Sequence, residues 1–594
     1  MLTPHLRRLL ESACSFLIFA VLFFAANNCF PQQAQFDGPA ELPRVYVASS
    51  LSSTPSHGKI ISVHSGDNLQ AAIDSASCGD RIEIQAAAVF SGVFHFPNKP
   101  CDDAHWITLR TSAPDSSLPP EGTRLKPCFA GVASLPGRPD FHCASTQNVL
   151  ARLEFSKNNG VGPLIFLSGA NHYRLVGLEV TRAAGNSVDY ALTSVAEGAQ
   201  ADHLIFDRVW MHGTPSDETT RAIAMVGMSQ VAVLDSFFTD FHCVAVTGTC
   251  TDAQVLSNGG GRTPSGPFKI VNNFMESSGE NILFGGGGAS MTPADIEIRG
   301  NHFFKPMIWK PGEPGFVGGA SGRPFIVKNL FELKNAQRVL FEGNILENCW
   351  GGFSQNGYAI VLTPKNQSRH CPLCKVTDVT IRYNLISNVG AGFAIANVAD
   401  EPGAYATAGE RYSIHDVVVE NVRGSQYQGS GLFVQLISLS PPLRSISITH
   451  SIAFVPRAIF AIMNVSVPFE SFDISNNILS ANQAPVVSSG GGARNCAEQA
   501  RLDPASVLKS CFVHSSFTHN LLIGDGGWPK GNITEKNARS AGVLESGGDV
   551  AYRLCASRDD HQCKKPSPAL HAGTDGKDIG PDFESLRRML SNVR

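Results

Sequence analysis

Short segments in which apolar and polar residues alternate recur along this chain from about residue 170 onward. The clearest copies span residues 296–303, 339–346 and 379–386, where alternating apolar residues lead into a short polar stretch that ends in Asn, followed by a second apolar segment. Alternation with period two, together with many Val, Ile and Phe, predicts β-strands, because successive side chains of a strand point to opposite faces. Helical repeats are excluded, since they would show a period of 3.6 residues.

The Asn position of this unit can be followed through eleven copies. It falls at residues 178, 209, 236, 273, 301, 344, 384, 422, 451, 477 and 520, at intervals of 26 to 43 residues. Six of these positions are asparagines, namely Asn273, Asn301, Asn344, Asn384, Asn477 and Asn520. Asn suits a turn because its amide tolerates left-handed backbone geometry and can form hydrogen bonds along a ladder. The varying intervals predict coils of constant shape that carry loops of different length.

A parallel β-helix explains this repeat better than the other solenoids do. Leucine-rich repeats need a Leu framework that the chain lacks, and propeller blades need about four strands per repeat, too many for the shorter intervals. In a parallel β-helix each coil stacks about 4.8 Å from the last. We therefore expect one all-β domain over residues 60–585, preceded by a linker at 27–59 and followed by a C-terminal tail at 586–594.

The start of this domain shows a different pattern. Leu69, Ala72 and Ile73 fall at helical spacing within Asn68–Ala76, and an alternating segment, Arg81–Ile84, follows. This predicts a short amphipathic helix that caps the N-terminal end of the β-helix.

Composition and charge exclude several broad classes. With 47 Lys and Arg against 51 Asp and Glu, the formal net charge is −4, so the chain lacks the concentrated basic surface of a nucleic-acid-binding protein. Hydrophobic residues make up 43% of the chain, which excludes global disorder. The 56 glycines punctuate short apolar runs and indicate frequent turns.

The N-terminus predicts export. Arg7 and Arg8 precede an uninterrupted apolar run from Phe16 to Ala26, which is too short for a membrane span of about 20 residues and suits a signal peptide over residues 1–26. Phe24 breaks the small-x-small cleavage pattern, so a retained N-terminal anchor is the alternative. We expect an extracellular, periplasmic or cell-surface monomer that touches a membrane only through such an anchor.

Fifteen cysteines in an exported chain predict disulfides. Their spacing suggests local disulfides that each close a loop: Cys78–Cys101, Cys128–Cys143, Cys243–Cys250, Cys496–Cys511 and Cys555–Cys563. The Cys371-Pro-Leu-Cys374 segment is consistent with a tight disulfide, a redox motif or half of a zinc site. The disulfide loop is favoured, because the zinc reading lacks further ligands at matching spacing and the redox reading lacks a βαβ context. Cys349 remains as the expected free thiol.

Several segments resemble a known superfamily. These are 66–84, 106–113, 266–273, 279–281, 301–306, 328–335 and 573–580. They resemble exported bacterial β-helix repeat proteins of the pectate-lyase-like superfamily, a largely uncharacterised family, over about residues 60–585. The resemblance implies a single-stranded right-handed parallel β-helix, and it implies polysaccharide as the partner.

The sequence signatures of two enzyme types of that superfamily are absent. Polygalacturonase-type hydrolases pair aspartates across the glycosidic bond, and adjacent Asp pairs occur here only beside cysteines outside the repeats. The Arg-x-Pro-x-x-Arg segment of one lyase family is absent as well. A polysaccharide lyase, which we favour over a hydrolase if the protein is an enzyme, remains beside two alternatives: a carbohydrate-binding or adhesive surface protein and a structural envelope protein.

Polar residues three or four positions past the Asn slot supply the candidate catalytic groups. On five successive coils they are His212, Asp240, Glu276, Lys305 and Glu347. Their register predicts a ladder along one edge, with Lys305 between the two glutamates. There it would serve as a base, or the carboxylates would bind Ca²⁺. The alternative is a solvated turn ladder of alternating charge.

Three further residues are candidates for binding substrate. Trp309 and Trp350 would offer flat platforms for sugar rings, although Trp in a β-helix is at least as often a core residue. Glu280, close before the glycine run at 285–288, is a candidate on a groove-edge loop. We expect any catalytic chemistry on the coils between residues 205 and 350, where long loops would form the walls of a groove.

Overall fold

The computed structural model describes residues 34–594 except 157–159, 186–187, 189, 245–249, 251, 260–264, 353–354, 399–400, 464, 466, 525, 546–549 and 558–561. Phe36–Arg594 form one compact unit. The expected signal peptide or anchor lies outside the described residues. Among the described residues, none forms a helix that is long and apolar enough to cross a membrane.

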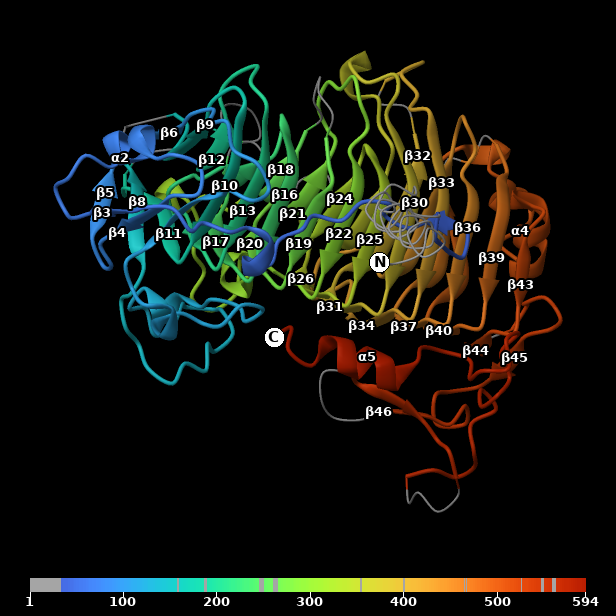
Figure 1. Cartoon of the computed structure of the whole chain (residues 1–594). Coiled ribbons are helices and arrows are strands. Elements are labelled where there is room, and N and C mark those ends of the chain that lie inside the picture. Colours follow the sequence, from blue (N-terminus) through green and yellow to red (C-terminus); the bar gives the residue numbers. More distant parts are fainter. Residues whose placement is uncertain are drawn as a thin grey trace, which may run out of the picture. The chain divides into compact units, whose positions relative to one another are not determined.

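Three long parallel sheets build this unit (Figure 1). Sheet I contains β3 (Ile60–Val63), β4 (Arg81–Ile84), β7 (Ile107–Thr111), β10 (Ala170–Val176), β13 (Ala201–Asp207), β16 (Met228–Leu234), β19 (Phe268–Val271), β22 (Ala294–Arg299), β25 (Ala336–Glu342), β30 (Lys375–Arg382), β33 (Ala408–His415), β36 (Arg444–Thr449), β39 (Phe469–Ser475), β42 (Phe512–Val513) and β43 (Ser516–Thr518).

Sheet II contains β5 (Val89–Ser91), β8 (Ala151–Phe155), β11 (Leu178–Arg182), β14 (Trp210–His212), β17 (Phe237–Phe241), β20 (Phe274–Ser277), β23 (His302–Phe304), β26 (Ile345–Cys349), β31 (Leu385–Val389), β34 (Val418–Val422), β37 (Ile452–Val455), β40 (Ile478–Ala481), β44 (Leu521–Ile523) and β45 (Ile533–Glu535). Sheet III contains β6 (Phe94–Phe96), β9 (Leu164–Phe166), β12 (Thr193–Val195), β15 (Arg221–Ala224), β18 (Gln254–Asn258), β21 (Glu280–Phe284), β24 (Phe331–Leu333), β29 (Tyr358–Leu362), β32 (Ala391–Asn397), β35 (Leu432–Ser438), β38 (Ala458–Met463) and β41 (Ala484–Ser489).

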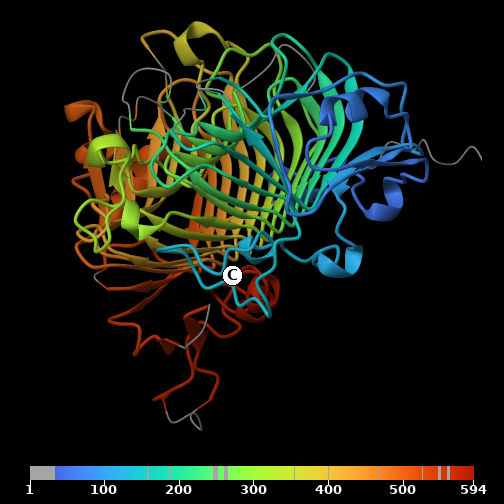
Figure 2. The same cartoon turned by 90° about the vertical axis from the view of Figure 1, so that its left-hand side faces the viewer.

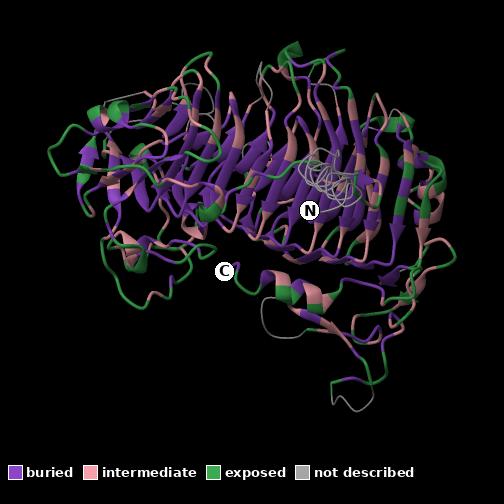
Figure 3. Ribbon diagram, in the orientation of Figure 1, coloured by how far each residue is buried: buried purple, intermediate pink, exposed green. Residues whose placement is uncertain are grey.

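Most coils give one strand to each sheet, in the order I, II, III, and each strand pairs with its equivalent on the next coil. The coil of β22, β23 and β24 shows this order, and its register to the following coil is parallel in all three sheets. Buried apolar residues of all three sheets form one continuous core. Figure 3 shows that the strands consist largely of buried residues. The chain is a single-stranded right-handed parallel β-helix, as the repeat and the resemblance predicted.

A few elements lie outside the three sheets. Among the described residues the α-helices are α2 (Leu69–Ser75), α3 (Cys496–Gln499), α4 (Pro504–Cys511) and α5 (Phe583–Leu590), beside several 3-10 helices of three residues. Three short antiparallel pairs are β1 (Phe36–Asp37) with β2 (Ala40–Glu41), β27 (Gly351–Gly352) with β28 (Gln355–Asn356), and β46 (Val543–Glu545) with β47 (Tyr552–Leu554). The predicted helix exists as α2, because the Asn68 side chain caps its first turn and Leu69, Ala72 and Ile73 are buried in the main core. That it caps the solenoid stays a prediction.

The turn between sheets I and II contains the predicted Asn ladder. Asn344 Oδ1 accepts hydrogen bonds from Asn301 N at 2.9 Å and from Asn301 Nδ2 at 3.1 Å, and Asn384 Oδ1 makes the same contacts to Asn344. The left-handed residue is the one before the ladder position, for example Asn272 and Tyr383. The Asn itself therefore supplies the hydrogen bonds and its predecessor makes the turn, which refines the expectation that Asn supplies both.

The strand register confirms ten of the eleven slots and corrects one. Val418 pairs with Leu385 on one side and with Ile452 on the other, so the slot of this coil is residue 417. The predicted slot at 422 is wrong by five residues. This coil carries Val417 at the slot where six others carry Asn, and its Asn421 lies directly before the position that was predicted.

The outer face of sheet II is covered by segments from two distant parts of the chain. In the early coils, Leu125 and Phe141 of the long loop between β7 and β8 pack against Phe237 and Phe274. In the later coils, the C-terminal segment with α5 covers the same sheet (Figures 1 and 2). Leu590 and Val593 are buried there, so much of the expected tail at 586–594 belongs to this cover.

The expected linker at 27–59 runs, in its described part, along the outer face of sheet I. Asp37 pairs with Arg382 of β30 at 2.6 Å, and the Ser49 carbonyl accepts a hydrogen bond at 2.8 Å from the buried Arg174 of β10. Sheet III, in contrast, is bordered by long excursions of the chain, such as residues 305–330 and 363–374.

The cysteine predictions are confirmed for every described residue. The disulfides are Cys78–Cys101, Cys128–Cys143, Cys243–Cys250, Cys371–Cys374, Cys496–Cys511 and Cys555–Cys563. Cys349 is the single unbridged cysteine in the described part of the chain, and it is buried. Its thiol lies against main-chain carbonyls, and burial raises its pKa to about 12.

Candidate functional site

The predicted polar ladder on sheet II does not form as a ladder. Glu276 pairs with Phe304 on the next coil, and Phe304 pairs with Glu347, so an aromatic residue lies between the two glutamates instead of Lys305. A register shift between Phe238 and Phe241 also takes Asp240 out of line. Counting three or four residues past a slot mixed positions on opposite faces of the sheet, because strand side chains alternate.

Asp240 and Glu276 are held by an arginine from the loop between β7 and β8. Arg138 donates to both Glu276 oxygens at 2.7 and 2.6 Å and to Asp240 Oδ1 at 2.6 Å. Burial raises the pKa of Glu276, although Arg138 opposes this. The guanidinium also lies 5.5 Å from the Trp309 ring. This closed arrangement fastens the loop to sheet II.

Lys305 lies inside the coil. Its side chain is fully buried, and Nζ donates to the carbonyls of Ser277 at 2.7 Å and Ser278 at 3.1 Å, and to that of Gly279. Burial lowers the pKa of Lys305 to about 8. All three N–H groups of the ammonium thus have main-chain partners, so the group tightens the turn between β20 and β21.

The remaining ladder residues lie in two separate contacts. His212 Nε2 is 2.9 Å from a Glu179 carboxylate oxygen, and His302 Nε2 is 3.1 Å from Glu347. The structure therefore does not bring the five candidates together.

The two candidate tryptophan platforms are buried. Trp309 and Trp350 are 1% and 2% exposed and pack in one cluster with Phe325, Val327 and Tyr427. Neither indole presents a face to a sugar ring. Both tryptophans are therefore core residues, which was the alternative to a sugar-binding platform.

Glu280 lies in a group of charged and polar side chains on or next to sheet III, which we call the sheet III charge cluster: Arg221, Asp252, Gln254, Glu280, Lys328, Glu332 and Lys334. The first row runs across neighbouring coils. Arg221 Nε donates to Gln254 Oε1 at 2.6 Å, and Gln254 Nε2 donates to Glu280 Oε2 at 2.9 Å. Lys328 Nζ lies 3.0 Å from Asp252 Oδ1 and 3.5 Å from Glu280 Oε1.

A second ion pair closes the cluster. Lys334 Nζ lies 3.2 Å from Glu332 Oε1. Glu332 is on β24 of the next coil, where it pairs with Leu283 of β21. Glu280 is fully buried, whereas the Asp252, Lys328 and Lys334 side chains keep contact with solvent. With 24% of its side chain exposed, Asp252 is the most open of the three carboxyl groups of the cluster.

Burial and neighbouring charges shift the pKa values of the Asp252 and Glu280 carboxyl groups in opposite directions. Burial and the adjacent Glu280 raise the pKa of Asp252 to about 7, against the opposing Lys328. Burial alone would also raise the pKa of Glu280, but the Lys328 and Lys334 ammonium groups outweigh it and hold that pKa well below its usual range. Near neutral pH Glu280 is thus ionised, and Asp252 exchanges a proton easily. Two carboxyl groups with separated pKa values are the hallmark of acid–base sites.

An aromatic ring adjoins the cluster. The Arg221 guanidinium lies 5.4 Å from the ring of Tyr190, which is 38% exposed just before β12 of sheet III. An exposed aromatic face beside charged groups is a suitable surface for a charged sugar.

The candidate residues do not fit Ca²⁺, which takes six to eight oxygen ligands. Among the described residues, neither the sheet II candidates nor the sheet III charge cluster brings ligand atoms of three different His, Cys, Asp or Glu residues within 4.8 Å of one another. In the cluster, lysine ammonium groups already lie against the carboxylates.

The sequence placed Glu280 on a groove-edge loop, which is wrong, since Glu280 is the fully buried first residue of β21. The sequence did not indicate the charged residues around it. Asp252 precedes β18 by two residues and Lys328 precedes β24 by three, so these side chains come from coils whose loops differ in length. The spacing of these residues along the chain does not indicate that their side chains lie close together. Alternation of charge with apolar residues, as in Glu332-Leu333-Lys334, was the one local hint.

This chain matches no protein-family model, and a search of curated proteins also finds no match. Among solved structures, a mannuronic acid specific polysaccharide family 6 lyase from human gut microbiota aligns with a TM-score of 0.44 at 9% identity, over 90% of this chain and 99% of that chain. The catalytic domain of a GH87 alpha-1,3-glucanase aligns with a TM-score of 0.43 at 9% identity, over 80% of this chain and 70% of that chain.

An alginate lyase from Paenibacillus sp. str. FPU-7 is also similar, with a TM-score of 0.29 at 12% identity, over 73% of this chain and 96% of that chain. At these values the similarities assign no reaction to this chain.

Proposed function

We propose that this protein is an exported enzyme that binds an acidic polysaccharide across sheet III and cleaves it by β-elimination. The observation that supports the proposal is the Asp252–Glu280 carboxyl pair joined by Lys328, in which the Asp252 side chain is 24% exposed and has a pKa raised to about 7. General bases work best when their pKa lies near the working pH. The six disulfides support the export part of the proposal.

In this mechanism Arg221 and Lys328 bind the carboxylate of a uronate unit, which makes its α proton more acidic. The Asp252 carboxylate takes that proton, the electron pair of the broken C–H bond forms the double bond to the neighbouring carbon, and the bond from that carbon to the glycosidic oxygen breaks. Asp252, now a carboxylic acid, returns the proton to the leaving oxygen. Glu280 stays ionised and keeps Lys328 positioned.

The geometry favours elimination over hydrolysis. Glycoside hydrolases place two carboxyl groups about 5–9.5 Å apart on either side of the sugar. Here Asp252 and Glu280 lie against the same Lys328 ammonium and interact directly with each other. No sugar ring fits between them.

The test is a panel of acidic and neutral polysaccharides, with unsaturated uronate absorbance and new reducing ends measured in parallel. We expect absorbance to rise on an acidic polymer, at a rate that increases with pH through about 7 as Asp252 ionises. Asp252→Asn should lower this rate at least about 100-fold. Asp473→Asn, an exposed aspartate on β39 of sheet I, is the matched control and should retain full activity.

Lys305→Ala tests the sheet II alternative. Loss of cleavage in Lys305→Ala with unchanged far-UV circular dichroism and thermal unfolding, together with full activity in Asp252→Asn, would move the site to sheet II. Reducing ends without unsaturated products would indicate hydrolysis and contradict the proposed reaction. Binding to the polymer without any cleavage would leave a carbohydrate-binding protein.

A further inference from the structure

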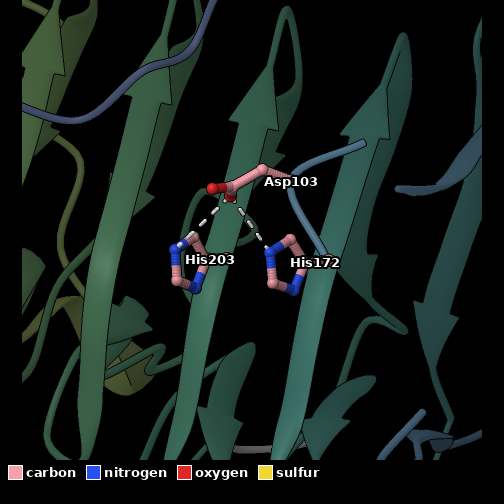
Figure 4. Close-up of side chains that lie close together, drawn as sticks. All are labelled: Asp103, His172 and His203. Carbon is pink, nitrogen blue, oxygen red and sulfur yellow. Dashed lines mark hydrogen bonds and ion pairs between the residues drawn. The ribbon is translucent and has the colours of Figure 1, made fainter. Parts of the chain in front are cut away.

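A separate cluster of titratable side chains lies on the outer face of sheet I. Asp103 comes from the loop before β7, and His172 and His203 come from the neighbouring strands β10 and β13 (Figure 4). His172 Nε2 lies 3.3 Å from Asp103 Oδ1, and His203 Nε2 lies 3.9 Å from the same oxygen. One ligand atom from each residue lies within 4.8 Å of the other two.

The two histidines occupy equivalent positions on successive coils. Each has left-handed backbone geometry, with φ of 55° and 52°, and the residues on either side of them pair in register. The same left-handed position recurs along sheet I, for example at Arg338 and Asp378. Because the coils stack directly, the two imidazole rings stack, with centroids 4.3 Å apart and ring planes 6° from parallel.

Hydrogen bonds fix which ring nitrogen carries the proton. His172 Nδ1 lies 2.7 Å from Asn171 Oδ1, and His203 Nδ1 is bonded to Asp202 Oδ1. The Asn171 amide is held in this orientation, since its Nδ2 donates to the Gly169 and Lys99 carbonyls at 2.8 and 3.0 Å. These oxygens only accept, so each Nδ1 is the donor, and in the neutral ring Nε2 keeps its lone pair.

Three atoms that carry lone pairs therefore lie close together, and without a bound cation they would repel one another. We propose that Asp103 Oδ1, His172 Nε2 and His203 Nε2 bind a divalent transition-metal ion, Zn²⁺ in the first place. Two metal–ligand bonds of about 2.1 Å reach about 4.2 Å, which exceeds both distances from the carboxylate to the imidazoles. Imidazole nitrogen with a single carboxylate suits Zn²⁺ and its neighbours in the first transition row better than Ca²⁺ or Mg²⁺.

The surroundings match the outer contacts of known metal sites. Metal-bound histidines commonly donate their second ring N–H to a carboxylate or another oxygen, as Asp202 and Asn171 arrange here. Trp106 packs edge-on beneath the pair, 5.0 Å from the His172 ring and 6.1 Å from the His203 ring. The Asp103 side chain is 86% exposed, so the ion would keep open positions for water or another ligand.

Metal binding at this site would fasten the loop that carries Asp103 to sheet I. That loop begins at Cys101, which is bridged to Cys78, and ends at the buried Trp106. The ion would bind the folded protein only, so it should raise the thermal midpoint of unfolding.

The test uses the full chain without a polyhistidine tag, stripped with EDTA and titrated with ZnCl₂ by calorimetry. We expect one Zn²⁺ per chain and at least a tenfold loss of affinity in His203→Gln and in Asp103→Asn. His571→Gln is the control, because His571 is an exposed histidine beside a single carboxylate, and it should bind as the unaltered chain does. Titration with Co²⁺ should quench tryptophan emission, and Trp106→Phe should remove most of that quenching.

An unaltered chain that takes up no Zn²⁺ would overturn the proposal, and so would equal affinities in the control and in both ligand variants. Fluorescence that Co²⁺ leaves unchanged while calorimetry still shows one ion would place the ion elsewhere and would likewise overturn it. The cleavage assay has no part in this test, so either result stands apart from the proposed function.

Discussion

Buried polar residues in this protein find many of their partners on neighbouring coils. His242 shows the effect on a single side chain. It is fully buried, Nε2 donates to the Thr214 carbonyl at 2.9 Å, and the ring stacks on Phe325 at 3.9 Å. Burial lowers the pKa of His242 to about 4. The histidine therefore stays neutral in the folded chain at pH values where it would be protonated in the unfolded chain.

This difference predicts a pH-dependent stability. Below pH 6.5 the unfolded chain binds a proton at His242 that the folded chain does not bind until about pH 4, so the free energy of unfolding falls as the pH falls between these values. The full contribution is about 3 kcal/mol. Urea unfolding at pH 7.5 and 4.5 measures it, and His242→Gln should lose clearly less stability over this range. An equal loss in that variant would assign the pH dependence to other groups.

The repeating element of the fold is the turn between sheets I and II. Each ladder Asn accepts hydrogen bonds from the preceding coil and donates to a main-chain carbonyl, as Asn344 Nδ2 does to the Ile298 carbonyl at 3.1 Å. Serine takes over part of this role on two coils, since Ser236 Oγ and Ser451 Oγ accept from the main-chain N–H groups of Val209 and Val417.

Removing one Asn of the ladder should lower the free energy of unfolding by more than its own hydrogen bonds contribute. Asn344→Ala leaves the buried N–H of Asn301 without its partner, and we expect the free energy of unfolding to fall by about 1–3 kcal/mol. Asn344→Ser should cost less, since serine fills the equivalent position elsewhere in the ladder. Urea unfolding of the three proteins would decide, and equal stability of Asn344→Ala and the unaltered chain would mean that water replaces the lost oxygen.

At the scale of the Phe36–Arg594 unit, segments distant in sequence cover two of the three sheets. The loop between β7 and β8 and the C-terminal segment cover sheet II, and residues 36–56 run along sheet I. Sheet III carries the charge cluster beside long excursions of the chain. This division places the proposed catalytic groups on one face and the proposed metal site on another.

The loop on sheet II depends on one arginine. Arg138→Met leaves the buried Glu276 carboxylate uncompensated, and we expect a loss of about 3–5 kcal/mol in the free energy of unfolding. Limited proteolysis should then cut within residues 113–149. Adding Glu276→Gln removes the uncompensated charge and should recover part of the loss. A double variant no more stable than Arg138→Met would mean that packing of Leu125 and Phe141, rather than charge, holds the loop.

Much of the fold could be predicted because strand alternation and the turn chemistry of Asn are local. The alternating segments and ten of the eleven slots follow from residues within about eight positions of one another, and so do the short-range disulfide pairs. The slot at 417, which carries Val, was misplaced, although the equally apolar slots at 178 and 209 were placed correctly. Local chemistry also marked Glu280 as a residue of interest.

Only the tertiary structure decided which side chains meet and which of them water can reach. A shift of one position turns a strand residue from the outer face to the core, which put Lys305 among main-chain carbonyls and Phe304 between Glu276 and Glu347. Asp252, Glu280 and Lys328 meet because coils stack whatever the length of the loops between them. Spacing along the chain cannot encode that contact, since the distance between coils is set by hydrogen bonds between strands and not by the number of residues that separate them.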